Sequence, residues 1–183
     1  MSKKSYDEQA GKRPDFMLKQ WYYEFPVGLL GIVERQGAIV RIHLGKQHKR
    51  ESRPFDEEET PLLRRAAEEL REYFSGLRTR FDLPLAPAGT PFQRAVWQAL
   101  TEIPCGETRT YAQVAVRVGR PRACRAVGMA NHCNPVMIVI PCHRVVGSDG
   151  SLTGYASGLP VKEYLLGLER GDLPLFGPPG ILP

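Results

Sequence analysis

Residues 136–146 read VMIVIPCHRVV, an apolar run that ends at a proline and leads directly into Cys142 and His143. Five apolar residues bounded by a proline are typical of a short buried strand. We therefore expect residues 136–140 to form a strand that fixes the Cys142 thiol at the edge of a core. Cysteine attacks as the thiolate, and a free thiol with a pKa of about 8.5 is only slightly ionised at neutral pH. The neighbouring histidine and nearby positive charge are expected to favour the thiolate.

Cys142 and His143 are adjacent, and adjacent residues on a strand point to opposite faces. Direct contact between their side chains would need a turn at Pro141, and the alternative is a bridging water. An acid that orients the histidine would complete a triad-like arrangement. Six acids in the C-terminal half could do this, and the residues alone do not choose among Glu102, Glu107, Asp149, Glu163, Glu169 and Asp172.

The charge distribution indicates a polyanionic partner. The chain has 183 residues, 20 acids and a net charge of +5, yet the 41 residues from Thr108 to Ser148 contain no acid. The same segment holds six arginines: Arg109, Arg117, Arg120, Arg122, Arg125 and Arg144. A solvated basic face is the alternative, but a basic segment of this length favours nucleic acid.

Composition excludes several classes of protein. The length suits one large or two small domains. No stretch approaches the roughly 20 apolar residues that span a membrane, and the first residues do not resemble a secretory signal. We therefore expect a cytoplasmic protein, associated with the nucleoid if prokaryotic. The four cysteines are expected to be free thiols, and without a CxxC pair no metal is expected.

The first half of the chain predicts a small α/β domain over residues 16–82, after a flexible tail at 1–15. The β-rich runs 21–33 and 38–44 on either side of a turn predict a hairpin. Thr60-Pro61 then opens a helix, which Gly76 ends. His43 and His48 are expected on the surface, and this domain is expected to be catalytically silent.

A Pro- and Gly-rich linker at 83–89 separates this domain from a second one at 90–171. Capping-box patterns at Thr90 and Thr110 predict two helices.

A further helix is predicted from Pro121 through Asn131. Together with the helix that begins at Thr110, it is predicted to form a helix-turn-helix. Arg122, Arg125 and Met129 are expected on one face of it, and Ala126, Val127 and Ala130 on the opposite, closely packed side. After a glycine-rich loop at 152–158, a last helix runs from Pro160 to Gly171, and a Pro/Gly-rich tail covers 172–183.

Several motifs in order resemble the O6-alkylguanine-DNA alkyltransferase family. Residues 140–145, IPCHRV, are similar to its active-site signature, and 125–131, RAVGMAN, precede them at the family spacing. Further matches are Asn134-Pro135, 106–108 before Tyr111, 152–155, Lys162-Glu163 and Leu168-Glu169. The resemblance extends without gaps over roughly residues 90 to 170 and more weakly over the first domain.

This resemblance implies an α/β (α+β) fold. A small N-terminal sheet-plus-helix domain, ribonuclease H-like, would precede a mainly helical domain with a winged helix-turn-helix-like motif. It implies irreversible transfer of an alkyl group from O6 of guanine in double-stranded DNA to Cys142, after base flipping. O4-methylthymine is a further candidate substrate. The family would bind the minor groove, need no cofactor, and be a monomer in solution; cooperative assembly on DNA is left open.

The resemblance also implies residue roles. His143 would act as a base through water, Glu169 would orient it, and Asn134 would brace the turn. Arg125 would fill the space of the flipped base beside Tyr111, with Arg122, Ala126 and Ala130 at the DNA. The alkylguanine pocket would be formed by Val145, Tyr155, Ala156, Lys162 and Met137.

Two departures from the family pattern could reshape this pocket: Ser157 stands where glycine is frequent, and Pro160-Val161 precedes Lys162. Two other functions are weighed against alkyl transfer. One is a DNA-binding regulator with Cys142 as a sensor, and the other is a cysteine hydrolase that forms an acyl-enzyme.

Overall fold

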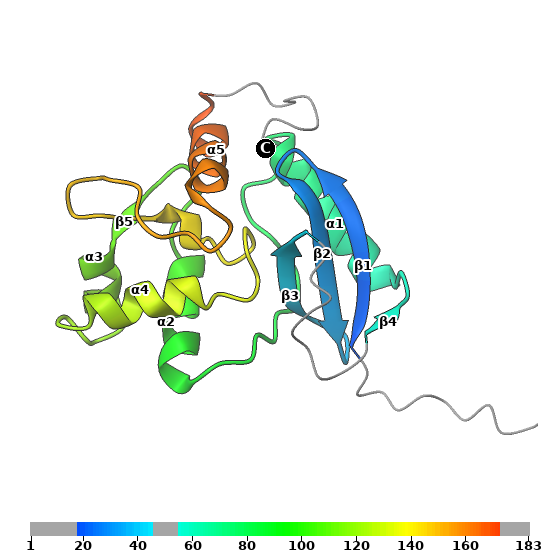
Figure 1. Cartoon of the computed structure of the whole chain (residues 1–183), viewed down its shortest axis with the longest axis horizontal. Helices are drawn as coiled ribbons and strands as arrows, with labels where there is room; N and C mark the ends of the chain where they lie inside the picture. The colour runs from blue at the N-terminus through cyan, green and yellow to red at the C-terminus, as the bar shows by residue number, and fades with distance from the viewer. Residues whose placement is uncertain (1–17, 46–54, 173–183) are drawn as a thin grey trace, which may run out of the picture.

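The computed structural model describes residues 18–45 and 55–172. The predicted tail at 1–15, nearly all of the tail at 172–183, and His48 lie outside these residues. The described helices and strands follow in chain order: β1 (Lys19–Phe25), β2 (Gly28–Arg35), β3 (Ala38–Leu44), β4 (Asp56–Glu57), α1 (Pro61–Phe74), α2 (Pro91–Thr101), β5 (Arg109–Thr110), α3 (Tyr111–Arg117), α4 (Cys124–His132), the 3-10 helix η1 (Cys142–Arg144), β6 (Val145–Val146) and α5 (Leu159–Arg170). The mixed α/β class with a sheet domain before a helical domain is confirmed (Figure 1).

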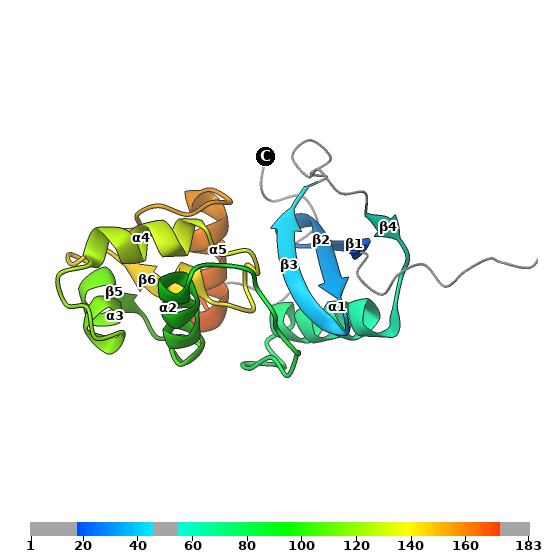
Figure 2. The same ribbon diagram turned by 90° about the horizontal axis from the view of Figure 1, so that it is seen from below.

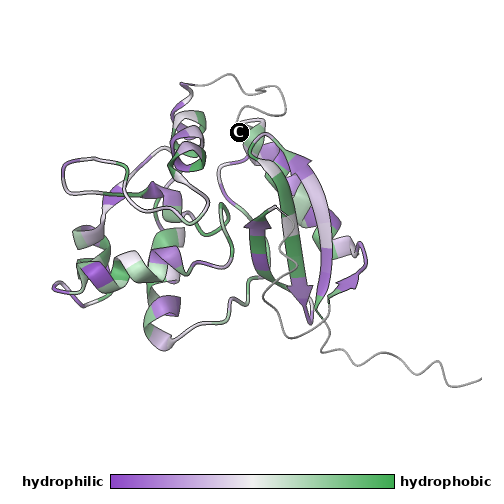
Figure 3. Ribbon diagram, in the orientation of Figure 1, coloured by the Kyte–Doolittle hydropathy of each residue, from purple (hydrophilic) through white to green (hydrophobic). Residues whose placement is uncertain are grey.

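The N-terminal sheet has the order β3-β2-β1-β4, with α1 packed against one face (Figures 1 and 2). Hydrophobic residues concentrate in β2 and β3 (Figure 3). The predicted hairpin is confirmed by the antiparallel pairing of β2 with β3 around Gln36-Gly37. The run 21–33 is not one strand, however, because the chain turns at Pro26 and Val27 and pairs β1 with β2 in antiparallel register. Pro26 has no backbone N–H to continue the strand, and Gly28 at φ +108° adopts a conformation that favours glycine.

Strand β3 joins the two halves of the molecule at its free edge. The Ile39 amide donates to the carbonyl of Pro84 at 2.8 Å, so the predicted linker pairs with the sheet. Farther along the same strand, the Ile42 amide donates to the carbonyl of Pro135 at 2.9 Å. The segment that precedes Cys142 is therefore held by backbone hydrogen bonds to the N-terminal sheet.

The helical domain begins as predicted. Both capping boxes are present, at Thr90 with Gln93 and at Thr110 with Gln113. The predicted start of the next helix at Pro121 is wrong, since α4 begins at Cys124 after a turn in which the Ala123 amide donates to the carbonyl of Arg120.

Arg122 therefore precedes α4, and its expected place on one helical face with Arg125 and Met129 is not observed. Burial of Val127 and Ala130 agrees with the predicted close packing of this side of α4, whereas exposure of Ala126 does not. Ala126 is exposed, whereas Ala130 is buried and its carbonyl accepts from Nε1 of Trp97 at 2.8 Å. The side chain of Ala130 is consequently part of the core and is not presented to DNA.

The predicted strand over 136–140 is absent. Its place is taken by two successive γ-turns, each closed by an amide that donates to the carbonyl two residues earlier. The Val139 amide donates to Met137 across Ile138, which has φ +71°, and the Cys142 amide donates to Ile140 across Pro141, at φ −82° and ψ 62°. All five residues are buried nonetheless, so their hydrophobicity reflects burial between the domains and not a sheet. A positive φ at a β-branched residue is strained, and here the Ile140 amide donates to the carbonyl of Val136 at 3.0 Å across the turn that contains Ile138.

Candidate active site

The turn that carries Cys142 is held by Asn134. Its side-chain amide donates to Sγ of Cys142 at 3.0 Å and to the carbonyl of Ile140 at 2.8 Å, while its Oδ1 accepts from the Val136 amide at 3.0 Å. Cys142 itself is 6% exposed and is the first residue of η1. One side chain thus contacts both the turn and the thiol, and it places a donor on the thiol.

His143 follows Cys142 in the 3-10 turn and points to Glu169 near the end of α5. The distance from Nε2 to Glu169 Oε1 is 2.7 Å, and both side chains are almost fully buried. A 3-10 helix turns about 120° per residue, so Cys142 and His143 do not lie on opposite faces as they would on a strand. Among the described residues Nδ1 of His143 has no hydrogen-bond partner.

Five hydrogen bonds besides that of His143 surround the Glu169 carboxylate. Arg144 donates three of them, from Nε to both oxygens and from Nη2 to Oε1, at 2.8–3.2 Å. The Gly106 amide donates to Oε2 at 3.0 Å, and the Tyr73 hydroxyl donates to Oε1 at 2.8 Å. Burial alone would raise the pKa of Glu169, but the contacts with His143 and Arg144 outweigh it and hold the pKa well below its usual value.

An ionised Glu169 accepts a hydrogen bond and cannot donate one, so Nε2 of His143 carries the proton of the neutral ring. Nδ1 then has the free lone pair and is the basic atom. Burial lowers the pKa of His143 below its ordinary value, although Glu169 opposes this effect. The imidazole is therefore neutral near pH 7 and able to accept a proton at Nδ1.

The charge around the thiol differs from the prediction. Burial raises the pKa of Cys142 to about 11, and the smaller opposing effects come first from the Asn134 amide and then from Lys162. Arg144 is engaged with Glu169 and with the carbonyl of Ile103, so it does not serve the thiol. Nearby positive charge favours the thiolate as expected, but it comes from Lys162 and not from an arginine, and burial outweighs it, so the thiol is protonated near pH 7.

A cavity of about 530 Å³ opens at Cys142. Its lining includes four residues of the expected pocket or its loop, namely Met137, Tyr155, Ala156 and Ser157. Ser157, one of the two departures from the family pattern, contacts Met137 through Oγ to Sδ at 3.5 Å.

Strand β3 also lines this cavity, through Arg41 and His43. The predicted surface position of His43 is wrong, because the residue is 7% exposed and packs edge-on against Tyr22.

Lys162 ties the glycine-rich loop to the turn. It is fully buried, and its Nζ donates to the carbonyl of Val145 at 2.6 Å and to that of Thr153 at 2.8 Å. The same Thr153 carbonyl accepts from the Tyr111 hydroxyl at 3.1 Å. A network thus connects the start of α3, the loop, and the residues after Cys142.

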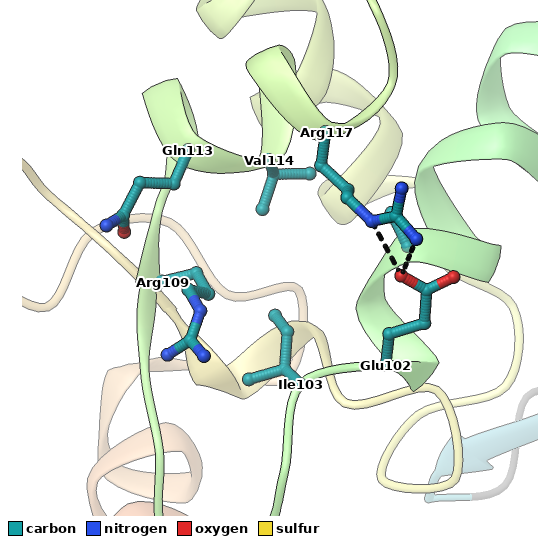
Figure 4. Close-up of a pocket in the computed structure, with 7 residues that line it drawn as sticks. Glu102, Ile103, Arg109, Gln113, Val114 and Arg117 are labelled. Atoms are coloured by element: carbon teal, nitrogen blue, oxygen red, sulfur yellow. Dashed lines mark hydrogen bonds and ion pairs between the residues drawn. The ribbon is translucent and has the colours of Figure 1, made fainter.

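The arginines of the acid-free segment fall into two groups. Arg109, Arg117 and Arg144 pair with acids outside that segment, as the contact between Arg117 and Glu102 at 2.7 Å shows (Figure 4). In contrast, Arg120, Arg122 and Arg125 are exposed and form no ion pair with any described residue. These three surround the start of α4, where uncompensated positive charge is therefore concentrated.

Three parts of this site were not found in the sequence. Tyr73 lies 96 residues before Glu169, and its position in α1 is that of an ordinary core residue. The Gly106 amide and the Arg144 guanidinium complete the shell of Glu169. Arg144 directly follows Cys142-His143 in the sequence, and an arginine in that place indicates a nearby carboxylate. No neighbouring residue in the sequence indicated a role for Tyr73.

Fold and site together define a protein that carries a buried cysteine beside a helix-turn-helix. Comparison with known proteins identifies its family. The family described as 6-O-methylguanine DNA methyltransferase matches in two parts, its ribonuclease-like domain at residues 18–87 and its DNA binding domain at 91–171. The chain belongs to this family.

Relatives agree with this placement. A Methanosarcina barkeri protein named methylated-DNA--protein-cysteine methyltransferase is 53% identical over 151 residues, which cover 82% of this chain and 96% of the relative. A constitutive protein of the same name from Bacillus subtilis is 47% identical over 80% of this chain and 92% of its own. The crystal structure of Mycobacterium tuberculosis OGT in complex with DNA has a TM-score of 0.76 and 39% identity, over 86% of this chain and 95% of that one.

Proposed function

We propose that this protein is a methylated-DNA–protein-cysteine S-methyltransferase that repairs O6-alkylguanine in double-stranded DNA by transferring the alkyl group to Cys142. The observation that carries this proposal is the linked set Asn134, Cys142, His143 and Glu169 beside a cavity of about 530 Å³. Family membership and relatives with the same named activity support it.

The chemical step needs a base because the thiol is protonated at rest. Nδ1 of His143 would take the proton of Cys142, directly or through one water, and Glu169 would stabilise the imidazolium that forms. The thiolate then attacks the alkyl carbon, an S–C bond forms, and the bond from that carbon to O6 breaks. The electron pair of that bond stays on guanine, and the proton given up by Cys142 passes from the imidazolium through solvent to guanine, so both His143 and guanine end neutral.

The product is a thioether, and no group in this site can hydrolyse it. We therefore expect one transfer per molecule and no requirement for a cofactor. This feature separates alkyl transfer from a cysteine hydrolase, whose acyl-enzyme would turn over.

A base stacked in a duplex cannot reach a thiol that is 6% exposed, so the target nucleotide must rotate out of the helix. Arg125 is exposed on α4 and is suited to fill the vacated space, while Arg120 and Arg122 would contact phosphates. Small, exposed Ala126 would permit close approach of α4 to the minor groove. Tyr111, which anchors the loop through Thr153, would border the flipped nucleotide.

Within the pocket, Tyr155 and Ala156 would contact the base, together with the backbone of Val145. Lys162 would act by holding the Val145 and Thr153 carbonyls in place. The proposal also includes four further properties: acceptance of O4-methylthymine, a monomeric state in solution, cooperative assembly on DNA and a cytoplasmic location. Among the described residues no helix is long and apolar enough to cross a membrane.

The test is incubation with duplex DNA that carries labelled O6-methylguanine, followed by separation of protein from DNA. We expect the label to move to wild-type protein and to stay on DNA with Cys142→Ala, which should still bind the duplex. A DNA-binding regulator would bind without transfer, and retention of label on DNA with the wild type would reject the proposal. A duplex with O4-methylthymine tests the second substrate in the same way.

A further inference from the structure

Tyr73 brings the N-terminal domain into the active site. It belongs to α1 and is 2% exposed, and its hydroxyl donates to Oε1 of Glu169 at 2.8 Å. The same oxygen lies 2.7 Å from Nε2 of His143. A phenol of the first domain and the imidazole of the second thus share one carboxylate oxygen.

We infer that Tyr73 is a positioning residue that sets the strength of the hydrogen bond between Glu169 and His143, and thereby the basicity of His143. This inference rests on the proposed function for its effect on transfer, but not for its effect on the imidazole. It replaces the expectation that the N-terminal domain is catalytically silent.

The physical argument is competition for one acceptor. A donor on Oε1 withdraws electron density from that oxygen and weakens its acceptance from Nε2. Without the phenol, the carboxylate would stabilise the imidazolium more strongly, and His143 would hold a proton to higher pH. Because the side chains of His143 and Glu169 are 0% and 1% exposed, bulk solvent has little access to replace the missing donor.

Other charged groups around His143 are accounted for. Glu169 and Lys162 act on it from α5, and Arg144 acts on it from η1. Cys105 interacts with Glu169 from the loop before β5. Tyr73→Phe alters none of these residues and removes only the hydroxyl that donates to Glu169, so a shift in His143 would report on the phenol.

The variant is Tyr73→Phe, which keeps the ring and removes the hydroxyl. Its matched control is Tyr164→Phe on α5, because the Tyr164 hydroxyl has no hydrogen-bond partner among the described residues. The measurements are the pKa of His143 by NMR of labelled histidine, and the single-turnover rate of methyl transfer against pH.

We expect the pKa of His143 in Tyr73→Phe to rise by a few tenths of a unit to about one unit, as the loss of one hydrogen bond allows. Transfer needs the neutral ring, so the acid limb of the rate profile should move to higher pH by the same amount. The control should leave both unchanged. Replacement of Tyr73 by 3,5-difluorotyrosine, a stronger donor, should shift both in the opposite direction.

An unchanged pKa of His143 in folded Tyr73→Phe and in the fluorinated protein would overturn the inference, even if the melting temperature fell. Equal shifts in Tyr164→Phe would also overturn it. If the wild type transfers no methyl group, the proposed function fails, while the NMR shift still decides the role of Tyr73.

Discussion

The side-chain amide of Asn134 lies 3.0 Å from Sγ of Cys142 and donates to it. A hydrogen bond to a charged sulfur is stronger than one to a neutral thiol, so this contact favours the thiolate against burial, which raises the pKa of Cys142 to about 11. Asn134 therefore both holds the turn and stabilises the thiolate form of Cys142.

Removal of this donor should slow methyl transfer. For Asn134→Ala we expect a decrease of about tenfold to a hundredfold, which corresponds to the ~1.5–3 kcal/mol of a hydrogen bond to a charged group. Asn134→Asp keeps Oδ1 as acceptor for the Val136 amide but removes the donor. Single-turnover rates should fall in both variants while DNA affinity is kept, and wild-type rates in Asn134→Asp would contradict the role of the amide.

Substitution of Glu169 should affect both transfer and stability. Glu169→Gln leaves Arg144 without its buried anionic partner, and we expect a loss of about 3–5 kcal/mol in the free energy of unfolding. Glu163→Gln on the exposed side of the same helix is the control and should change neither quantity. Urea unfolding and single-turnover rates measure the two effects.

The same residue predicts a pH dependence of stability. Because the pKa of Glu169 is lower in the folded protein than the usual 4.5, its contribution is present above about pH 4.5 and is lost as the pH falls. The lowered pKa of His143 acts in the same direction below its usual 6.5, because the unfolded chain binds that proton more readily. Wild-type stability should thus fall more steeply than that of Glu169→Gln as the pH drops below about 4.5, and parallel curves in that range would contradict this assignment.

Lys162 should act through the loop that it holds. Lys162→Met preserves much of the side-chain volume but leaves the carbonyls of Val145 and Thr153 without this donor, at a cost of about 1–3 kcal/mol for each group that stays buried. We expect slower transfer and faster amide hydrogen exchange across residues 152–158. The control is Lys19→Met in β1, where the side chain is 37% exposed and pairs with Glu58. Protection of the loop equal to the wild type in Lys162→Met would reject this role.

Arg125 and Arg122 provide a matched pair at the DNA surface, since both are exposed and only Arg125 belongs to α4. Arg122→Ala should lower affinity and reduce the slope of log K against log salt by about 1, as expected for one phosphate contact. Arg125→Ala should also slow transfer from duplex DNA far more than transfer from the free base. Equal effects of the two substitutions would argue against a part for Arg125 in base flipping.

The parts of the fold that local chemistry determines could be predicted from the sequence. Thr90 and Thr110 each form a capping box with a glutamine three residues later, and Gly171 ends α5 with φ +78°. The motifs around Cys142 also located His143, Asn134 and Glu169, although the choice of Glu169 among six acids came from the family resemblance.

Features that depend on contacts between distant segments could not be predicted in this way. The run at 136–140 has the composition of a strand, yet it forms γ-turns. Two hydrogen bonds hold it in that conformation, one from the Ile42 amide in β3 to the carbonyl of Pro135 and one from the Asn134 side chain to the carbonyl of Ile140. A short apolar run does not by itself distinguish these outcomes. Likewise, His43 and Tyr73 have no local signature of a place at the site, which only the packing of the two domains creates.

The central claim is that Cys142 accepts one alkyl group and is then spent. The most direct measurement uses a tenfold excess of duplex DNA with labelled O6-methylguanine, followed by counting of label per protein and mass spectrometry of the cysteine peptides. We expect transfer to stop at one methyl group per molecule, with a mass increase of one methylene on the peptide that contains Cys142. Continued release of repaired DNA beyond one equivalent, or a methyl group on Cys105, Cys124 or Cys133 instead, would contradict the account.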